Sequence, residues 1–293
     1  MKKMWAVPVL AAAICLGATG CGGNGSGAID QKGANVFPVS AVEDSLSITM
    51  GDVMPFYDDG IMYIYHLRNI TDTNINFYHP IASISTSDFI HYTDNGIAID
   101  FNKENDMKSV DAALGTGSCI KANDGVYHFF YTGHNDKGQE EGLPYNEVVR
   151  HATSTDQKKW DKDEDFKLYG WENDFRDPYV YYDSVDNIYY MLITTRDAGK
   201  AVIKRYSAHT LSATAAEWNE GYVDNFFTND EGDYNMECPS YIELNGFYYL
   251  AYSEQGNNRV THYRYKTSHD GEWRRFGRDS IDASGFYAGR LEK

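Results

Sequence analysis

Positive charge is scarce in this sequence: 26 Lys and Arg stand against 43 Asp and Glu, a formal net charge of −17. Binding to nucleic acid or to anionic lipid relies on Lys and Arg, so this balance argues against both partners. The sequence also lacks a GxxxxGKS/T phosphate loop and the HExxH and CxxC spacings of metal sites, and the folded body lacks a GxGxxG phosphate loop. We therefore expect no nucleic-acid partner, no metal and no cofactor.

Cysteine is scarce too, with four in the chain. Cys15 and Cys21 lie close to the N-terminus, which leaves Cys119 and Cys238 for the folded body. Two thiols do not make a disulfide framework, although a single bridge between them stays possible.

The N-terminus carries the one long apolar run, from Met4 to Leu16, behind two lysines and ahead of small residues. This pattern predicts a secretory signal over residues 1–20. Cys21 follows directly, and the arrangement resembles a bacterial lipoprotein signal in which Cys21 is lipidated. We expect a membrane-anchored extracytoplasmic protein with a Gly/Ser-rich tether over residues 21–45. The alternative is ordinary secretion with an incidental cysteine.

Aromatic residues are abundant, at 15% with 24 Tyr, and they follow a repeat. A short strand, a turn and a Tyr-rich strand recur about every 60 residues, with turns at Gly60, Gly125, Asn187 and Gly246. Asn-Gly and Asp-Gly between apolar runs are strong hairpin signals. A third strand follows each hairpin, and a long helical periodicity is absent.

Three or four strands per unit, repeated radially, predict an all-β fold, a five-bladed β-propeller over residues 46–293. The fifth unit begins at residues 282–288, and its turn would fall beyond Lys293. The last blade is therefore either incomplete or closed by residues before Asp52. A β-sandwich with similar hairpins is the alternative fold.

Carboxylic acids stand near the start of three units. Asp52, Asp177 and Glu237 precede their turns by similar distances, and Ser118 takes the corresponding place in the second unit. Equivalent strand ends meet at one mouth of a propeller channel, so we expect these side chains to converge there. Clustered carboxylates repel one another, which makes a purely structural role a poor explanation. One protonated and one ionised carboxyl is the arrangement that glycoside hydrolysis needs.

Residues 51–55, 175–178 and 237–239 resemble the three acidic motifs of glycoside hydrolase family 32, and the resemblance runs from Asp52 to Ala288. It implies that Asp52 is the nucleophile, Asp177 the transition-state stabiliser and Glu237 the general acid/base. It also implies that Arg176 binds substrate and keeps Asp177 ionised, and it makes Ser118 a candidate substrate contact.

The resemblance predicts a retaining hydrolase of β-fructosides that acts as a monomer on an oligo- or polysaccharide. Retention requires the Asp52 and Glu237 carboxyls to lie about 5–5.5 Å apart. The sequence departs from the family in its opening motif, Gly51 to Pro55, and we expect no C-terminal β-sandwich. Two alternatives stay open: an inverting hydrolase of the arabinanase or xylosidase type, and a non-catalytic carbohydrate-binding lipoprotein.

Overall fold

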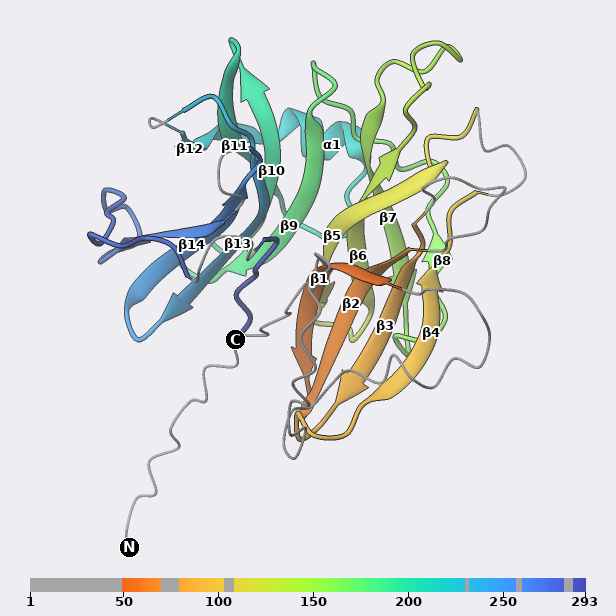
Figure 1. Ribbon diagram of the computed structural model, residues 1–293, viewed down its shortest axis with the longest axis horizontal. Coiled ribbons are helices and arrows are strands. Elements are labelled where there is room, and N and C mark those ends of the chain that lie inside the picture. The colour runs from red at the N-terminus through yellow and green to blue at the C-terminus, as the bar shows by residue number, and fades with distance from the viewer. Residues whose placement is uncertain (1–48, 70–78, 103–107, 230–231, 257–259, 282–286) are drawn as a thin grey trace, which may run out of the picture.

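A computed structural model of the chain describes residues 49–69, 79–102, 108–229, 232–256, 260–281 and 287–293. The described residues are mostly β-strand (Figure 1). In chain order the elements are β1 (Thr49–Asp58), β2 (Ile61–Asn69), β3 (Ile81–Thr86), β4 (Thr93–Ile99), β5 (Ala113–Lys121), β6 (Tyr127–His134), β7 (Glu147–Ser154), β8 (Asp161–Lys162), β9 (Phe175–Asp183), β10 (Ile188–Asp197), β11 (Lys200–Ala208), α1 (Ala215–Glu220), β12 (Tyr222–Thr228), β13 (Met236–Leu244), β14 (Phe247–Glu254) and β15 (Thr261–Lys266).

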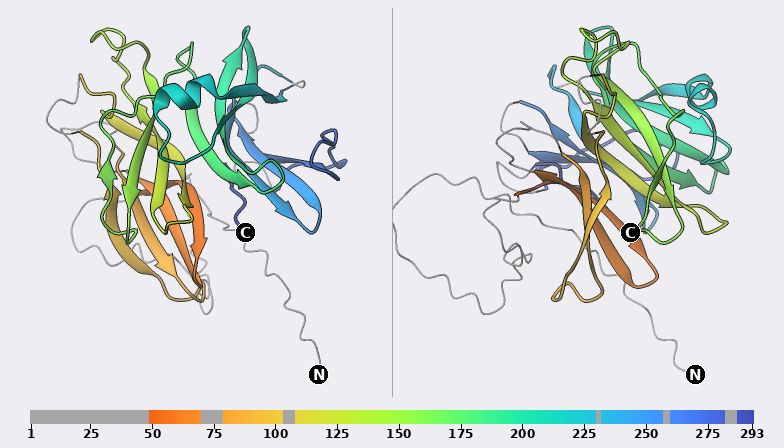
Figure 2. Two further views of the ribbon diagram at one scale, coloured as in Figure 1. Left: turned by 180° about the vertical axis from the view of Figure 1, so that it is seen from behind. Right: turned by 90° about the vertical axis from the view of Figure 1, so that its right-hand side faces the viewer.

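The described strands form four antiparallel sheets, ordered β1-β2-β3-β4, β5-β6-β7-β8, β9-β10-β11-β12 and β13-β14-β15. Each sheet is one blade, and the first strand of each blade lies toward the centre of the molecule (Figures 1 and 2). Strand β5 contacts both β1 and β9, and β9 contacts β13. The arrangement is propeller-like and confirms the all-β prediction.

The predicted turns account for the blades. Gly60, Gly125, Asn187 and Gly246 all have positive φ, between 54° and 88°, as hairpin turns of this kind require. The Tyr-rich run after each turn forms the second strand of its blade, and the predicted third strands are β3, β7, β11 and β15.

The hydrophobic core lies between the blades. Tyr65, Phe129 and Trp160 pack edge to face between the first two blades. Phe130, Met191 and Trp218 belong to the cluster between the second and third blades, and Leu192, Tyr241 and Tyr252 to the one between the third and fourth. Both faces of the middle blades are therefore covered, which explains why β6 is buried along nearly its whole length.

Helix α1 was not predicted from the sequence. Thr214 caps it by accepting the Glu217 N–H, while the Glu217 carboxylate accepts the Thr214 N–H, a capping box that the spacing Thr-x-x-Glu encodes. Trp218 is its buried residue and anchors the helix to the core.

Each inner strand carries a bulge near its N-terminal end. The pairing shifts between Gly51 and Val53 in β1, between Leu114 and Gly117 in β5, and between Glu237 and Ser240 in β13. In β9 the shift lies between Arg176 and Tyr179. A bulge turns side chains out of the regular alternation. The bulges of β5, β9 and β13 meet, because Asp177 accepts from the Thr116 hydroxyl and from Cys238 N–H.

The C-terminal segment, residues 287–293, lies between the fourth and first blades. Leu291 N–H donates to Ser240 Oγ at 2.9 Å, and Tyr57 N–H donates to Glu292 Oε1 at 3.0 Å. Ala288 has the same left-handed backbone as Asp177, with φ of 58° and 57°. Residues 282–286, the start of the predicted fifth unit, lie outside the described residues.

The predicted signal, Cys21 and the tether also lie outside the described residues. Within the described part of the chain, no helix combines the length and apolar character needed to cross a membrane. Cys119 and Cys238 are both free and buried, so the bridge that the sequence left open is not formed.

Candidate functional site

Asp177 is held on all sides by polar groups at the bulge of β9. Its Oδ1 accepts the Thr116 hydroxyl, and its Oδ2 accepts Cys238 N–H at 2.9 Å. Its own N–H donates to Thr132 Oγ1 at 2.9 Å. Donors on both carboxylate oxygens stabilise negative charge and fix the orientation of the side chain.

Glu237 lies on the neighbouring strand β13 and is bound by Arg176. Arg176 Nε and Nη2 donate to Glu237 Oε1 at 3.0 and 2.8 Å. The same guanidinium donates to Glu147 at 3.0 Å and to Asp174 at 2.7 Å. The sequence predicted that Arg176 supports Asp177, but in the structure its hydrogen bonds go to Glu237, and its effect on Asp177 is through charge alone.

The pKa of Glu237 is raised to about 7. Burial is the largest cause, because desolvation penalises the charged carboxylate; the negative charges of Asp177 and Asp52 add to it. Arg176 opposes the shift by charge and by hydrogen bonding. Glu237 can therefore hold a proton near neutral pH and also release it, as an acid that later acts as a base must do.

Asp52 is the extra residue of the bulge in β1 and is partly exposed. Its charge contributes to the raised pKa of both Glu237 and Cys238, so Asp52 lies within electrostatic range of those two residues. Three carboxyl groups from three blades thus share one electrostatic environment.

The strand register corrects one prediction. Asp177 and Cys238 both have left-handed backbone, both lie in a bulge and both precede a proline. Cys238 is therefore the counterpart of Asp177, and Glu237 that of Arg176. Counting residues back from the turns had matched Asp177 with Glu237, one residue before its true counterpart. The count was wrong because the turn after β9 spans residues 184–187, whereas the turn after β13 spans only 245–246.

Ser118 lies beyond the bulge of β5, whose re-aimed residues are Gly115 and Thr116. Its buried hydroxyl accepts Val180 N–H at 2.9 Å and so joins the second blade to the third. A role of Ser118 in binding substrate stays a prediction.

Sequence reasoning missed the residues that hold the acids. Thr116 bonds Asp177, and the buried Arg290 donates to Thr116 Oγ1 at 3.0 Å and to Pro239 O at 3.0 Å. Glu147 binds Arg176 from β7. These residues carry no motif of their own, since their roles arise from contacts between blades far apart in the chain.

The fold and site together define a β-propeller with a carboxylate cluster at one end of its channel. The model for the glycosyl hydrolases family 32 N-terminal domain matches residues 54–289. The chain therefore belongs to glycoside hydrolase family 32.

Two kinds of relative agree with this assignment. A sucrose-6-phosphate hydrolase of Vibrio alginolyticus is 26% identical over 201 residues, 65% of this chain and 36% of that protein. Among solved structures, a Bombyx mori GH32 β-fructofuranosidase matches with a TM-score of 0.61 and 20% identity, over 80% of this chain and 48% of that one. The sucrose-6-phosphate hydrolase of Lactobacillus gasseri matches with a TM-score of 0.60 and 18% identity, over 83% and 48%. The chain thus spans about half the length of these enzymes or less, and the structural likeness concerns the fold.

Proposed function

We propose that this protein is a glycoside hydrolase that cleaves β-fructosides with retention of configuration. The observation that carries the proposal is a largely buried Glu237, with its pKa raised to about 7, beside Asp177 of the adjacent strand β9 and within electrostatic range of Asp52. A proton donor beside further carboxyl groups suits glycosidic cleavage, and family membership directs the proposal to fructosides.

In the proposed mechanism, an Asp52 oxygen attacks the anomeric carbon while Glu237 gives its proton to the leaving oxygen. A covalent fructosyl–Asp52 ester and a free alcohol result. Glu237, now a base, takes a proton from water as the water oxygen attacks the same carbon and releases Asp52. Asp177 holds the hydroxyls of the bound sugar, and Arg176 keeps Glu237 in place throughout.

The direct test is incubation with sucrose, inulin and levan, scored for released fructose. We expect Glu237→Gln to lower kcat by about 10²–10⁴-fold, the usual contribution of general acid–base catalysis. Asp52→Asn removes the nucleophile and should leave no measurable turnover. Wild-type chain that releases no fructose from any of the three would overturn the proposal.

We also propose that residues 287–293 form the inner strand of a fifth blade, supported by their hydrogen bonds to both neighbouring blades.

We further propose that a lipid on Cys21 anchors the protein to the cell membrane on its extracytoplasmic side. This proposal rests on the N-terminal sequence. Metabolic labelling with a fatty acid tests it: a Cys21→Ser chain should lose the label and leave the membrane fraction. Label that persists in this variant would contradict anchoring through Cys21.

A further inference from the structure

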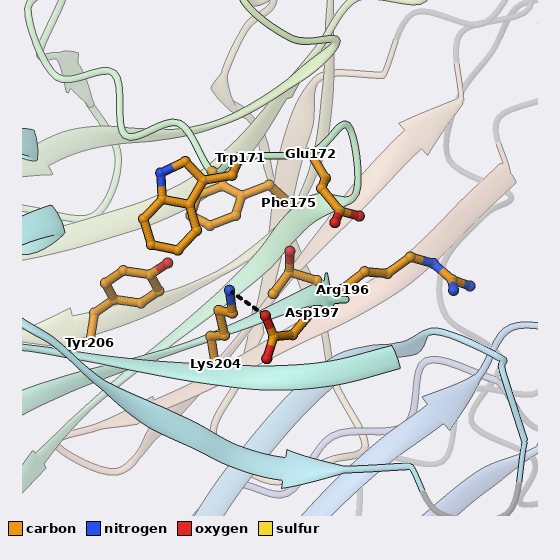
Figure 3. Close-up of a pocket in the computed structure, with 9 residues that line it drawn as sticks. Trp171, Glu172, Phe175, Arg196, Asp197, Lys204 and Tyr206 are labelled. Carbon is orange, nitrogen blue, oxygen red and sulfur yellow. Dashed lines mark ion pairs between the residues drawn. The ribbon is translucent and has the colours of Figure 1, made fainter. Parts of the chain in front are cut away.

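A pocket of about 150 Å³ lies on the third blade, and none of the three acids lines it. Trp171 and Phe175 lie on one side, and Lys204, Asp197 and Tyr206 on the other (Figure 3). This volume is below the roughly 300–1,000 Å³ of most small-molecule sites. The pocket therefore suits a single ring rather than a whole oligosaccharide.

Trp171 offers a largely exposed aromatic ring, over which the Lys204 ammonium lies on one side. It is 62% exposed, whereas Trp218 and Trp160, which serve the core, are at most 9% exposed. Tyr222 meets it edge to face at 6.3 Å and holds the indole upright without covering it. An aromatic ring presented in this way can stack on the apolar C–H face of a sugar.

Lys204 supplies the polar contact. Its side chain is only 6% exposed, and its ammonium lies 4.7 Å from the centre of the Trp171 ring. Its ion pair with Asp197 spans 3.8 Å, longer than an ordinary hydrogen bond. A buried ammonium in this position gains from an oxygen acceptor brought by a ligand.

The charges around the pocket favour a neutral ligand. The carboxylates of Asp197 and Glu172 lie on the same pocket as Lys204, so an anion would meet two negative charges. Sugar hydroxyls can both accept from Lys204 and donate to a carboxylate. Arg196 is already committed to Asp174, at 3.2 Å, and to two backbone carbonyls.

The pocket lies close to the acids along the chain. Phe175, which lines it, is the first residue of β9, and Asp177 follows two residues later, about 7 Å along a strand. Asp174 links the two places, because it binds Arg196 of the pocket and Arg176 of the site. A saccharide of several units held at the acids can therefore reach Trp171.

We infer that this pocket is an accessory sugar-binding site, in which one ring of a longer saccharide stacks on Trp171 and accepts a hydrogen bond from Lys204. The inference rests on the proposed function, since it assumes a saccharide substrate. It makes the protein selective for chains longer than a disaccharide.

Calorimetry on the full chain tests it, with Glu237→Gln in every sample to prevent turnover. The probes are sucrose and fructo-oligosaccharides of three to five units, and the readout is the ratio of the affinity for the longest probe to that for sucrose. We expect Trp171→Ala to lower this ratio about three- to tenfold, the size of an aromatic contact. Lys204→Met, which keeps the apolar stem, should lower it as well.

Tyr182→Ala is the matched control. Tyr182 is an exposed aromatic on β9, at the opposite end of that strand from Phe175, which lines the pocket. It should leave the ratio unchanged, and thermal melts verify that all variants fold. The inference would be overturned if both pocket variants kept the parent ratio. It would also be overturned if they lost affinity for sucrose and for the longest probe equally. Trp171-dependent binding in these samples, together with no hydrolysis of any probe by the chain that keeps Glu237, would instead overturn the proposed function alone. Absence of binding to every probe would overturn both.

Discussion

At the scale of single residues, Arg176 decides how strongly Glu237 holds its proton. Burial raises the pKa of Glu237, whereas the charge and hydrogen bonds of Arg176 lower it. The balance of these effects leaves the pKa at about 7. Removing the guanidinium must raise the pKa of Glu237 further. Glu237 would then stay protonated, and so could act as the general acid, up to a higher pH.

We therefore expect Arg176→Gln to shift the alkaline limb of the kcat/KM–pH profile upward, while the rate at the optimum falls by about 10- to 100-fold because Glu237 loses its orientation. Arg205→Gln is the control, since Arg205 pairs with Asp224 on the outer part of the same blade. Its alkaline limb should stay in place. An unshifted limb in Arg176→Gln would refute the role of Arg176 in setting the pKa of Glu237.

Thr116 offers a second test of the site. Its hydroxyl donates to Asp177 and accepts from Arg290, so Thr116→Val removes a hydrogen bond to a charged group. Such a bond is worth about 1.5–3 kcal/mol, which corresponds to a loss of about 10- to 150-fold in kcat/KM. Thr116→Ser keeps the hydroxyl and should restore most of the activity. Equal activity in the valine and serine variants would contradict this role.

Residues of the site could be predicted from the sequence only where they belong to a short, recognisable motif. Arg176, Asp177 and Glu237 stand beside prolines and acids in recognisable order, and the structure brings the two acids together. Thr116 and Arg290 are common residue types without a pattern. Their positions beside Asp177 depend on how blades two, four and the C-terminal segment meet, which local sequence does not encode.

At the scale of elements, the bulges of the inner strands require close approach between strands. Gly117 follows the bulge of β5, and a Cβ placed there would lie 1.9 Å from Phe130 O. The nearest atoms, Phe130 O, Phe130 C and Tyr131 Cα, are all backbone of β6, so no side chain can move aside to make room. By contrast, a Cβ on Gly125 meets nothing within 4 Å, and its positive φ of 88° is the only obstacle.

We expect Gly117→Ala to destabilise the protein by more than about 3 kcal/mol, or to prevent folding. Gly125→Ala should cost only about 1–2 kcal/mol, the strain of a left-handed alanine. Denaturant midpoints measure the difference, and soluble expression serves where the first variant does not fold. Similar midpoints for the two variants would show that the strands separate easily at this bulge.

The strands themselves were predictable, because hairpin turns and Tyr-rich runs are local signals. The bulges were not, since an extra residue in one strand is defined by its partner. The match of Asp177 with Glu237 rather than with Cys238 had another cause, the longer turn after β9. Helix α1 was missed although its capping box stands in the sequence, because six residues are too few for a helical period to appear.

At the scale of the whole molecule, the last residues described link the fourth blade to the first. Glu292 accepts Tyr57 N–H and is held in an environment whose burial raises its pKa to about 7. In the unfolded chain a glutamate titrates near 4.3. Between these values the folded state binds more protons than the unfolded state, so stability falls as pH rises from about 4.3 to about 7.

Glu292→Gln keeps an acceptor for Tyr57 N–H and removes the titrating group. The melting temperature of this variant should therefore fall less between pH 5 and pH 8 than that of the parent, by roughly 2–4 °C for each kcal/mol involved. Glu243→Gln is the control: Glu243 is exposed and its pKa is lowered by the Gly246 N–H, so its stabilising effect is lost only in more acidic solution. If the melting temperature of Glu292→Gln fell with pH as much as that of the parent, the contact between the C-terminal segment and β1 would not limit stability. The hydrogen bonds of Leu291 and Arg290 to β13 would then hold this segment in place.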